Sequence, residues 1–166
     1  MKIRLVEPKS KSHNVYDHSR LPRLGLPQIG ARLVEHGHDV KIYVESLVPI
    51  DVDDLLSADL VGFSTTTGTT PPAYELADRL REQGRPVVFG GAHVTFLPDE
   101  GLQHADYVVR GEGHTAMLEL VEALETGGDV SQIAGLSYHD VNGPVHNPDR
   151  PFCPEAVFAD LPNPDL

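Results

Sequence analysis

Short apolar runs alternate along this chain with stretches in which apolar residues recur at helical spacing. The runs have the length and β-branched content of buried strands, and they lie at residues 3–6, 40–44, 60–63, 87–89 and 107–109. Between the third and fourth runs, Ala73, Leu76, Ala77 and Leu80 fall on one face of a helix. This alternation is typical of βαβ units and predicts an α/β fold built on a parallel sheet.

With right-handed crossovers, five such strands form a parallel sheet of order 2-1-3-4-5. Helices on both faces of the sheet then give a three-layer sandwich of the flavodoxin-like (Rossmann-like) type. In such sheets, ligands bind beyond the carboxyl ends of the strands, at the point where strands one and three diverge. We therefore expect a binding site formed by the loops after strands one, three, four and five.

The last part of the chain has a different character. Residues 133–139 and 144–146 flank Asp140-Val141-Asn142-Gly143, and the Asn-Gly pair favours the positive φ angles of a tight β-hairpin. Five prolines follow between Asn147 and Leu166, too many for a packed element. We predict one α/β domain over residues 1–147, which includes a small C-terminal hairpin at 133–147, and an extended Pro-rich linker or tail at 148–166.

The charge balance excludes one large class of partners. The chain has 13 basic and 25 acidic residues, a net charge of -12, whereas nucleic-acid binding requires clustered Lys and Arg. All four lysines lie at or before Lys41, which disfavours lysine-based phosphate binding by the later strands. The chain has no apolar run of membrane-spanning length and no signal-peptide pattern at its start. We expect a cytoplasmic protein with neither a nucleic-acid nor a membrane partner.

A hydroxyl-rich loop and two glycine-centred turns follow the third, fourth and fifth predicted strands. They read Ser64-Thr65-Thr66-Thr67-Gly68, Gly90-Gly91-Ala92-His93 and Arg110-Gly111-Glu112-Gly113. Glycine lets a ligand approach the backbone closely because it has no Cβ atom. The GxGxxG of a dinucleotide site does not follow the first strand, and the chain contains no Gly-Lys pair for a P-loop. NAD binding and P-loop ATP hydrolysis are therefore disfavoured.

The order and spacing of these three loops resemble the cobalamin-binding domains that precede the catalytic barrel of class B radical S-adenosylmethionine enzymes. Leu24-Gly25-Leu26 and Gly37-His38-Asp39-Val40 also resemble the first helix and second strand of that family. The resemblance implies that the serine-containing turn and the Gly-Gly turn hold the nucleotide tail of cobalamin. The cofactor-binding residues that it implies are Leu24, Gly25, Ser64, Thr65, Thr66, Thr67, Gly90, Gly91, His93, Gly111, Glu112 and Gly113.

The chain departs from the wider cobalamin family at two points. The Asp-x-His-x-x-Gly signature, which supplies a histidine to cobalt in methionine synthase-like proteins, is absent because Asp17 and His18 are adjacent. The resemblance therefore implies base-off cobalamin without a histidine ligand. His114 stands where the family often has Glu. We assign His93 to cofactor contact rather than to coordination, and we name no metal ligand and no catalytic residue.

The radical enzymes bind their iron-sulfur cluster through CxxxCxxC, whereas this chain has a single cysteine, Cys153. We therefore expect a module that is not catalytic alone and that positions (methyl)cobalamin for a radical S-adenosylmethionine methyltransferase barrel in cis or in trans. The iron-sulfur cluster and S-adenosylmethionine would bind only in that barrel. Two other classes stay open: a flavodoxin-like binding domain for a flavin or sugar nucleotide, and a non-catalytic interaction domain.

Overall fold

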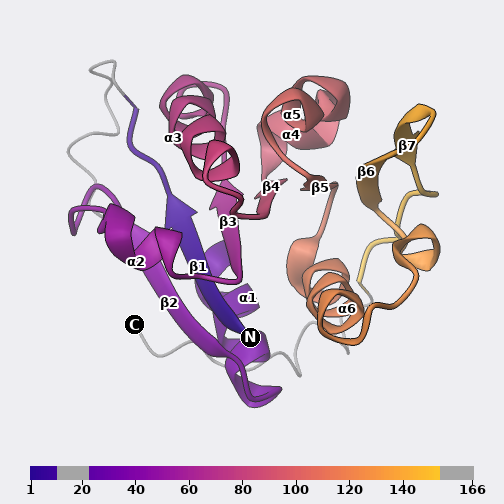
Figure 1. Ribbon diagram of the computed structural model, residues 1–166, viewed down its shortest axis with the longest axis horizontal. Helices are drawn as coiled ribbons and strands as arrows, with labels where there is room; N and C mark the ends of the chain where they lie inside the picture. Colours follow the sequence, from indigo (N-terminus) through magenta and orange to yellow (C-terminus); the bar gives the residue numbers. More distant parts are fainter. Residues whose placement is uncertain (11–22, 154–166) are drawn as a thin grey trace.

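The computed structural model describes residues 1–10 and 23–153 and contains one seven-stranded sheet (Figure 1). Its order is β2-β1-β3-β4-β5-β6-β7. The strands are β1 (Lys2–Glu7), β2 (Asp39–Val44), β3 (Leu60–Ser64), β4 (Val87–Gly90), β5 (Tyr107–Val109), β6 (Leu136–Asp140) and β7 (Gly143–His146). The first five are parallel to one another, so the expected order 2-1-3-4-5 is confirmed.

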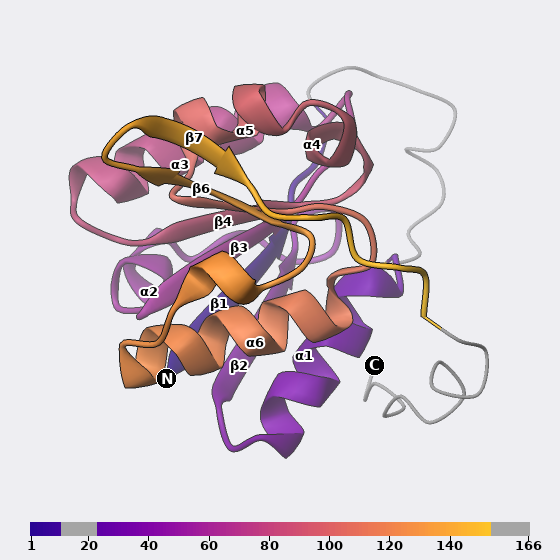
Figure 2. The ribbon, with the colours of Figure 1, turned by 90° about the vertical axis from the view of Figure 1, so that its right-hand side faces the viewer.

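Helices cover both faces of the sheet. They are α1 (Gly25–Glu35), α2 (Val52–Leu56), α3 (Thr70–Glu82), α4 (Ala92–Phe96), α5 (Pro98–His104) and α6 (Gly113–Thr126), with a 3-10 turn at Val130–Gln132. In Figure 2, α3, α4 and α5 lie above the sheet, and α1 and α6 lie side by side below it. The three-layer sandwich predicted from the sequence is therefore confirmed.

Two separate cores result, one on each face of the sheet. The first contains apolar side chains of α2, α3, α4 and α5, and the second contains those of α1 and α6. Successive residues of a strand point to opposite faces, so each central strand contributes to both cores. In β3, Phe63 belongs to the first core, whereas Leu60 belongs to the second.

Aromatic rings fill the first core behind the carboxyl ends of β3 and β4. The rings of Phe63 and Phe89 are stacked with centroids 5.2 Å apart, and Tyr74 of α3 meets Phe89 edge-on at the same distance. Tyr74 also stacks on the imidazole of His104 with centroids 4.0 Å apart. Such stacked and edge-on pairs are favoured by the charge distribution of the rings, and here they leave this face of the sheet closely packed.

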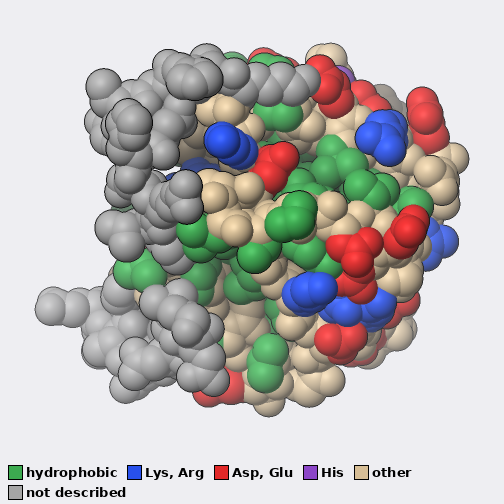
Figure 3. Space-filling model, turned by 90° about the vertical axis from the view of Figure 1, so that its left-hand side faces the viewer, with side chains coloured by type: hydrophobic (Ala, Val, Ile, Leu, Met, Phe, Trp, Pro, Cys, Tyr) green, Lys and Arg blue, Asp and Glu red, His purple; other side chains and the backbone are tan. Residues whose placement is uncertain are grey.

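A charged cluster stabilises the β2 edge of the same face. Arg4 is only 5% exposed, and its Nε donates to Asp54 Oδ2 at 2.8 Å. Tyr43 Oη donates to the same oxygen at 2.8 Å, and Lys2 Nζ lies 2.9 Å from the other carboxylate oxygen. Burial opposes ionisation, but these donors outweigh it and hold the pKa of Asp54 well below its usual value. The molecule's surface on this side carries basic and acidic groups next to one another, with hydrophobic side chains between them (Figure 3).

The C-terminal hairpin extends the main sheet instead of standing apart from it. Strand β6 pairs antiparallel with β5, and β7 pairs with β6. Asp140 pairs with Gly143, so the two turn residues are Val141 and Asn142. The expectation of positive φ at Asn142 is wrong, because among the described residues only glycines have positive φ. Asp140 stabilises this turn instead by accepting a hydrogen bond from the Asn142 amide at 2.6 Å.

The segment after the hairpin is held against the domain up to Cys153. Gly135 N donates to Pro148 O at 2.8 Å, and Arg150 pairs with Glu119 of α6. Cys153 N then donates to Glu112 Oε2 at 2.6 Å. The expected extended linker thus begins with residues bonded to the domain, and its remainder lies outside the described residues. None of the described helices has the length and apolar character needed to cross a membrane.

Candidate functional site

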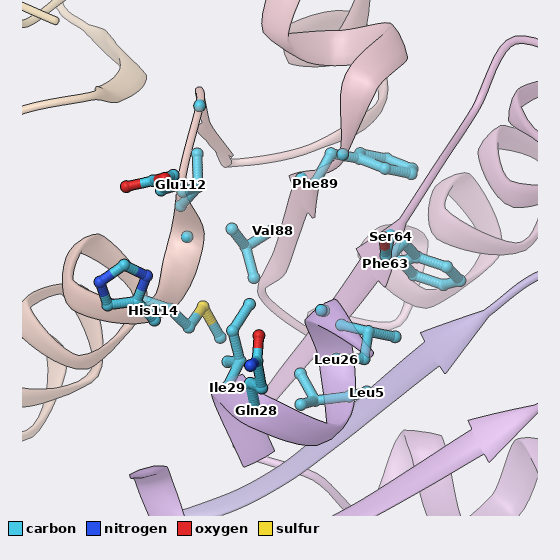
Figure 4. A pocket seen from close by; sticks show the side chains of 18 residues that line it. Leu5, Leu26, Gln28, Ile29, Phe63, Ser64, Val88, Phe89, Glu112 and His114 are labelled. Carbon is cyan, nitrogen blue, oxygen red and sulfur yellow. The ribbon is translucent and has the colours of Figure 1, made fainter. Parts of the chain in front are cut away.

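A cavity of about 260 Å³ opens at the carboxyl ends of the parallel strands, on the face covered by α1 and α6 (Figure 4). Its walls come from the N-terminal parts of these two helices and from β1, β3, β4 and β5. This is the place where the strand order reverses between β1 and β3, as the sequence pattern predicts. Its lining includes Leu5, Leu26, Gln28, Ile29, Gly62, Val88, Val109, His114 and Met117, which sequence reasoning did not assign to a site.

Glycines leave the room for this cavity. Gly62 and Gly90 lie in β3 and β4 at positions that alternate with Phe63 and Phe89, so a side chain at either glycine would point toward the cavity. A Cβ atom at Gly90 would meet nothing closer than Val109 O at 3.8 Å. A Cβ atom at Gly62 would lie 2.8 Å from Leu5 Cδ2 and would shift the apolar floor. Figure 4 shows the ring of Phe89 directed away from Val88, toward the packed face of the sheet.

The floor of the cavity is apolar and its rim is polar. Leu5, Val88 and Met117 are at most 4% exposed and contribute to the core beneath the cavity. At the rim, the N-cap residues Leu24 of α1 and Glu112 of α6 form no side-chain cap hydrogen bond. The first amide groups of both helices are therefore not capped by these side chains, and helix N-termini favour negatively charged groups.

Seven of the twelve proposed cofactor residues line this cavity. They are Gly25, Ser64, Gly90, Gly91, Gly111, Glu112 and Gly113. They come from four elements that are distant in the sequence, and the parallel sheet brings them to one edge. Their assignment to a cofactor stays a prediction, but their convergence is a property of the fold.

The other five proposed residues lie outside the cavity lining. Leu24 is 57% exposed, and Thr65 is fully buried and donates its amide and hydroxyl hydrogens to Gly90 O at 2.9 and 3.3 Å. Thr66 accepts hydrogen bonds at its carbonyl from the hydroxyls of Thr69 and Thr70, which stabilises the start of α3. The contacts of Thr65 and Thr66 are thus the ordinary contacts of a loop and a helix start.

Thr67 and His93 meet at the same edge, on the face of the sheet opposite the cavity. His93 Nδ1 lies 3.3 Å from Thr67 Oγ1, and its Nε2 lies 3.0 Å from Glu100 Oε1. The His93 side chain is only 8% exposed and meets the ring of Tyr74 edge-on. The imidazole is therefore held on both nitrogens by side chains of the protein.

Gly91 has a backbone role that its neighbour Gly90 does not share. Its φ of +101° lies in the region that L side chains rarely adopt, and a Cβ atom there would lie 2.4 Å from Thr65 O. The Gly-Gly turn therefore combines one position that the fold requires to be glycine with one that leaves space in the cavity.

His114 is a buried polar residue of the lining that sequence reasoning left without a role. Only 8% of the residue is exposed, and this burial lowers the pKa of its imidazole. The carboxylate of Glu112 raises the pKa, whereas the guanidinium groups of Arg32 and Arg150 lower it further. Within the described ranges, no hydrogen bond to this imidazole is formed. The signal that could have identified it is its place in the first turn of α6, one residue after Gly113.

Comparison with known proteins agrees with this architecture. Residues 17–121, well over half of the chain, match the B12 binding domain family. An uncharacterized methyltransferase from Pyrococcus horikoshii is 38% identical over 157 residues, which cover 87% of this chain and 34% of that protein. An anaerobic magnesium-protoporphyrin IX monomethyl ester cyclase from Synechocystis is 30% identical over 132 residues, which cover 72% of this chain and 26% of the cyclase. The chain thus spans about a third or less of the length of these relatives.

Solved structures share the fold. The radical S-adenosylmethionine methyltransferase TsrM from Kitasatospora setae, solved with cobalamin and a 4Fe-4S cluster bound, matches 93% of this chain and 30% of its own with a TM-score of 0.73 and 21% identity. The cobalamin-dependent S-adenosylmethionine radical enzyme OxsB, solved with aqua-cobalamin bound, matches 98% of this chain and 24% of its own with a TM-score of 0.77 and 20% identity. The family match, the parallel strand order and the cavity at its switch point lead to one conclusion: the chain belongs to the B12-binding domain family.

Proposed function

We propose that this chain binds cobalamin in the base-off form, with the nucleotide tail in the cavity between α1 and α6 and without a histidine ligand to cobalt. The cavity carries this proposal. It is deep enough to have an apolar floor, which suits the flat benzimidazole base, and its rim has two helix N-termini, which suit the phosphodiester of the tail. Ser64, Gly90, Gly111 and Glu112 would border the tail as it enters.

The corrin ring would then lie outside the cavity, over the carboxyl edge of the sheet. Thr66, Thr67 and His93 belong to the loops at this edge, which is why they stay in the proposed cofactor site although they do not line the cavity. The hydrogen bonds of His93 to Thr67 and Glu100 occupy both ring nitrogens, which supports contact with the cofactor rather than coordination of cobalt.

The chain would supply this cofactor to a separate catalytic unit. Its relatives are about three times as long, and TsrM is a methyltransferase that holds a 4Fe-4S cluster as well as cobalamin. We propose that a radical S-adenosylmethionine barrel, in cis or in trans, binds the iron-sulfur cluster and S-adenosylmethionine. Methylcobalamin is the methyl donor that such a barrel would use. This chain's residues would bind, shield and orient the cofactor.

The test is retention of hydroxocobalamin by the purified full chain after desalting, read from the visible spectrum. The proposal expects about one equivalent with a base-off spectrum. Gly90→Val would place a side chain in the cavity and should weaken binding at least 100-fold with the fold kept. Gln83→Val introduces a valine at the exposed C-terminal end of α3, away from the cavity, and should bind like the unchanged chain.

Two results would contradict the proposal in different ways. Complete separation of pigment from the unchanged chain would exclude cobalamin as its ligand. Equal retention by Gly90→Val, with the circular dichroism spectrum unchanged, would show that the cofactor does not use this cavity.

A further inference from the structure

We propose that Glu112, His114 and Cys153 form a binding site for a divalent cation of the zinc type at the rim of the cavity. The site is separate from the cobalt of cobalamin and goes beyond the proposed function. It would use one oxygen, one nitrogen and one sulfur ligand, and it would join the segment after the hairpin to the start of α6.

The three ligand atoms are already close together. The imidazole nitrogen of His114, a carboxylate oxygen of Glu112 and the sulfur of Cys153 all lie within 4.8 Å of one another. Zinc bonds of about 2.0–2.3 Å in a tetrahedral site place ligand atoms about 3.3–3.8 Å apart. Side-chain rotations that move the atoms by about 1 Å would therefore complete the site.

The backbone holds the ligands in this arrangement from two directions. Glu112 is the N-cap residue of α6 and His114 lies in its first turn, so two donors come from one rigid helix start. Cys153 comes from the segment after the hairpin, and its amide donates to Glu112 Oε2 at 2.6 Å. Arg150, three residues earlier, fixes the same segment through Glu119 of α6 and through Ala134 O at 3.2 Å.

His114 gives an independent reason to expect a ligand. Only 8% of the residue is exposed, and the described residues form no hydrogen bond with its ring nitrogens, whereas buried polar groups in folded proteins are normally paired. A bound cation would satisfy one ring nitrogen. An imidazole in its neutral form has the lone pair that coordination requires.

The charges around the cluster set the class of cation. Glu112 and a Cys153 thiolate would together neutralise a divalent ion. Magnesium and calcium prefer oxygen ligands throughout, while mixed sulfur, nitrogen and oxygen sets select zinc and its close analogues. Three protein ligands leave the fourth position open, and Glu112 and His114 both line the cavity.

Cobalt(II) chloride is a suitable probe for the cobalamin-free full chain, because thiolate-bound Co²⁺ absorbs in the near ultraviolet and tetrahedral Co²⁺ absorbs in the visible. The proposal expects both bands to saturate at one equivalent and to be bleached by one equivalent of Zn²⁺. Cys153→Ser should remove the near-ultraviolet band and weaken Co²⁺ binding at least tenfold. His114→Gln should weaken binding to a similar degree, while His139→Gln, in the hairpin, should leave it unchanged.

The outcome separates this site from the cobalamin proposal. Cys153 is not part of the cavity lining, so Cys153→Ser should retain hydroxocobalamin like the unchanged chain, whatever its metal binding. Absence of saturable Co²⁺ bands in the unchanged chain would overturn the metal site, as would bands that survive in Cys153→Ser. If the His114→Gln variant proves unstable, Cys153→Ser alone decides, because its side chain is nearly isosteric.

Discussion

The two faces of the sheet differ most where β3 and β4 end. On one face, Phe63, Phe89 and Tyr74 fill the space with stacked and edge-on rings. On the other, Gly62 and Gly90 alternate with the same phenylalanines and leave a cavity. The same two strands therefore have a closely packed face and a face with a cavity. Successive residues point to opposite faces, so phenylalanine side chains fill one face while glycines leave space on the other.

This contrast separates what stabilises the fold from what binds a ligand. Substitutions on the packed face should change the free energy of unfolding and leave the cavity's shape intact. Substitutions on the hollow face should change binding with little effect on stability. Gly91 lines the cavity and also packs against the backbone of Thr65, so its substitution should change both stability and binding.

The largest effect should come from emptying the packed face. Phe89 is fully buried between Phe63 and Tyr74. We expect Phe89→Ala to lower the free energy of unfolding by about 3–5 kcal/mol, because it removes a large apolar group and leaves a cavity. Urea unfolding followed by circular dichroism measures this. A loss below 1 kcal/mol would contradict the packing described for this face.

The adjacent glycines of the β4 turn give a direct comparison. Gly91→Ala forces an alanine into φ +101° and against Thr65 O, so we expect a loss of about 1–3 kcal/mol from backbone strain, with more from displacement of Thr65. Gly90→Ala meets only ordinary contacts and should change stability by less than about 1 kcal/mol. Equal thermal melting temperatures for the two variants would show that the turn does not distinguish these positions.

The charged cluster on the packed face should respond to pH. The pKa of Asp54 is depressed in the folded chain, so its contribution is present above the pKa of the unfolded chain and is lost as pH falls toward the folded value. Asp54→Asn should cost about 1–3 kcal/mol at pH 7, because hydrogen bonds from charged donors are lost. As pH falls below about 4, the difference in urea midpoint between the variant and the unchanged chain should shrink steadily. A constant difference down to pH 2 would contradict this assignment.

The smallest effect is expected from His114 on the hollow face. Burial lowers the pKa of its imidazole in the folded chain, so the unfolded chain takes up a proton first as pH falls. Stability should be full above about pH 6.5 and decline below it. His114→Gln should show a flatter profile between pH 7 and pH 5, measured as melting temperature without added metal. An unchanged slope would indicate that this imidazole does not contribute to the pH dependence.

Much of the fold could be predicted from local patterns. The five parallel strands coincide with the short β-branched runs of the sequence. Gly37 and Gly84 come just after α1 and α3 and have positive φ, as glycines that end helices do. The pairing of β6 with β5 was not predicted, because no local pattern indicates which strand of the sheet a following hairpin joins. In the expected hairpin turn, Gly143 has the positive φ that the Asn-Gly pair favours, whereas the positive φ expected for Asn142 is wrong, since the side chain of Asp140 stabilises another geometry there.

The candidate site was predicted in part for a similar reason. Turn residues such as Gly90, Gly111 and Glu112 are visible in the sequence because glycine and helix-start signals are local. The apolar floor is not, because Leu5, Val88 and Met117 have the spacing of ordinary core residues and only the packing around Gly62 opens a space above them. The position of Cys153 beside Glu112 depends on the course of a segment that has no repeating pattern.

The strand order has a consequence for the behaviour of the protein at high concentration. An open edge strand presents unpaired amide and carbonyl groups on which a second molecule can add a strand. At one edge, β2 carries the exposed charges of Asp39 and Lys41, and at the other, β7 is short and contains Pro144, which has no amide hydrogen to donate. Both borders of the sheet thus disfavour intermolecular strand addition, so the protein should resist growing into β-aggregates while it stays folded.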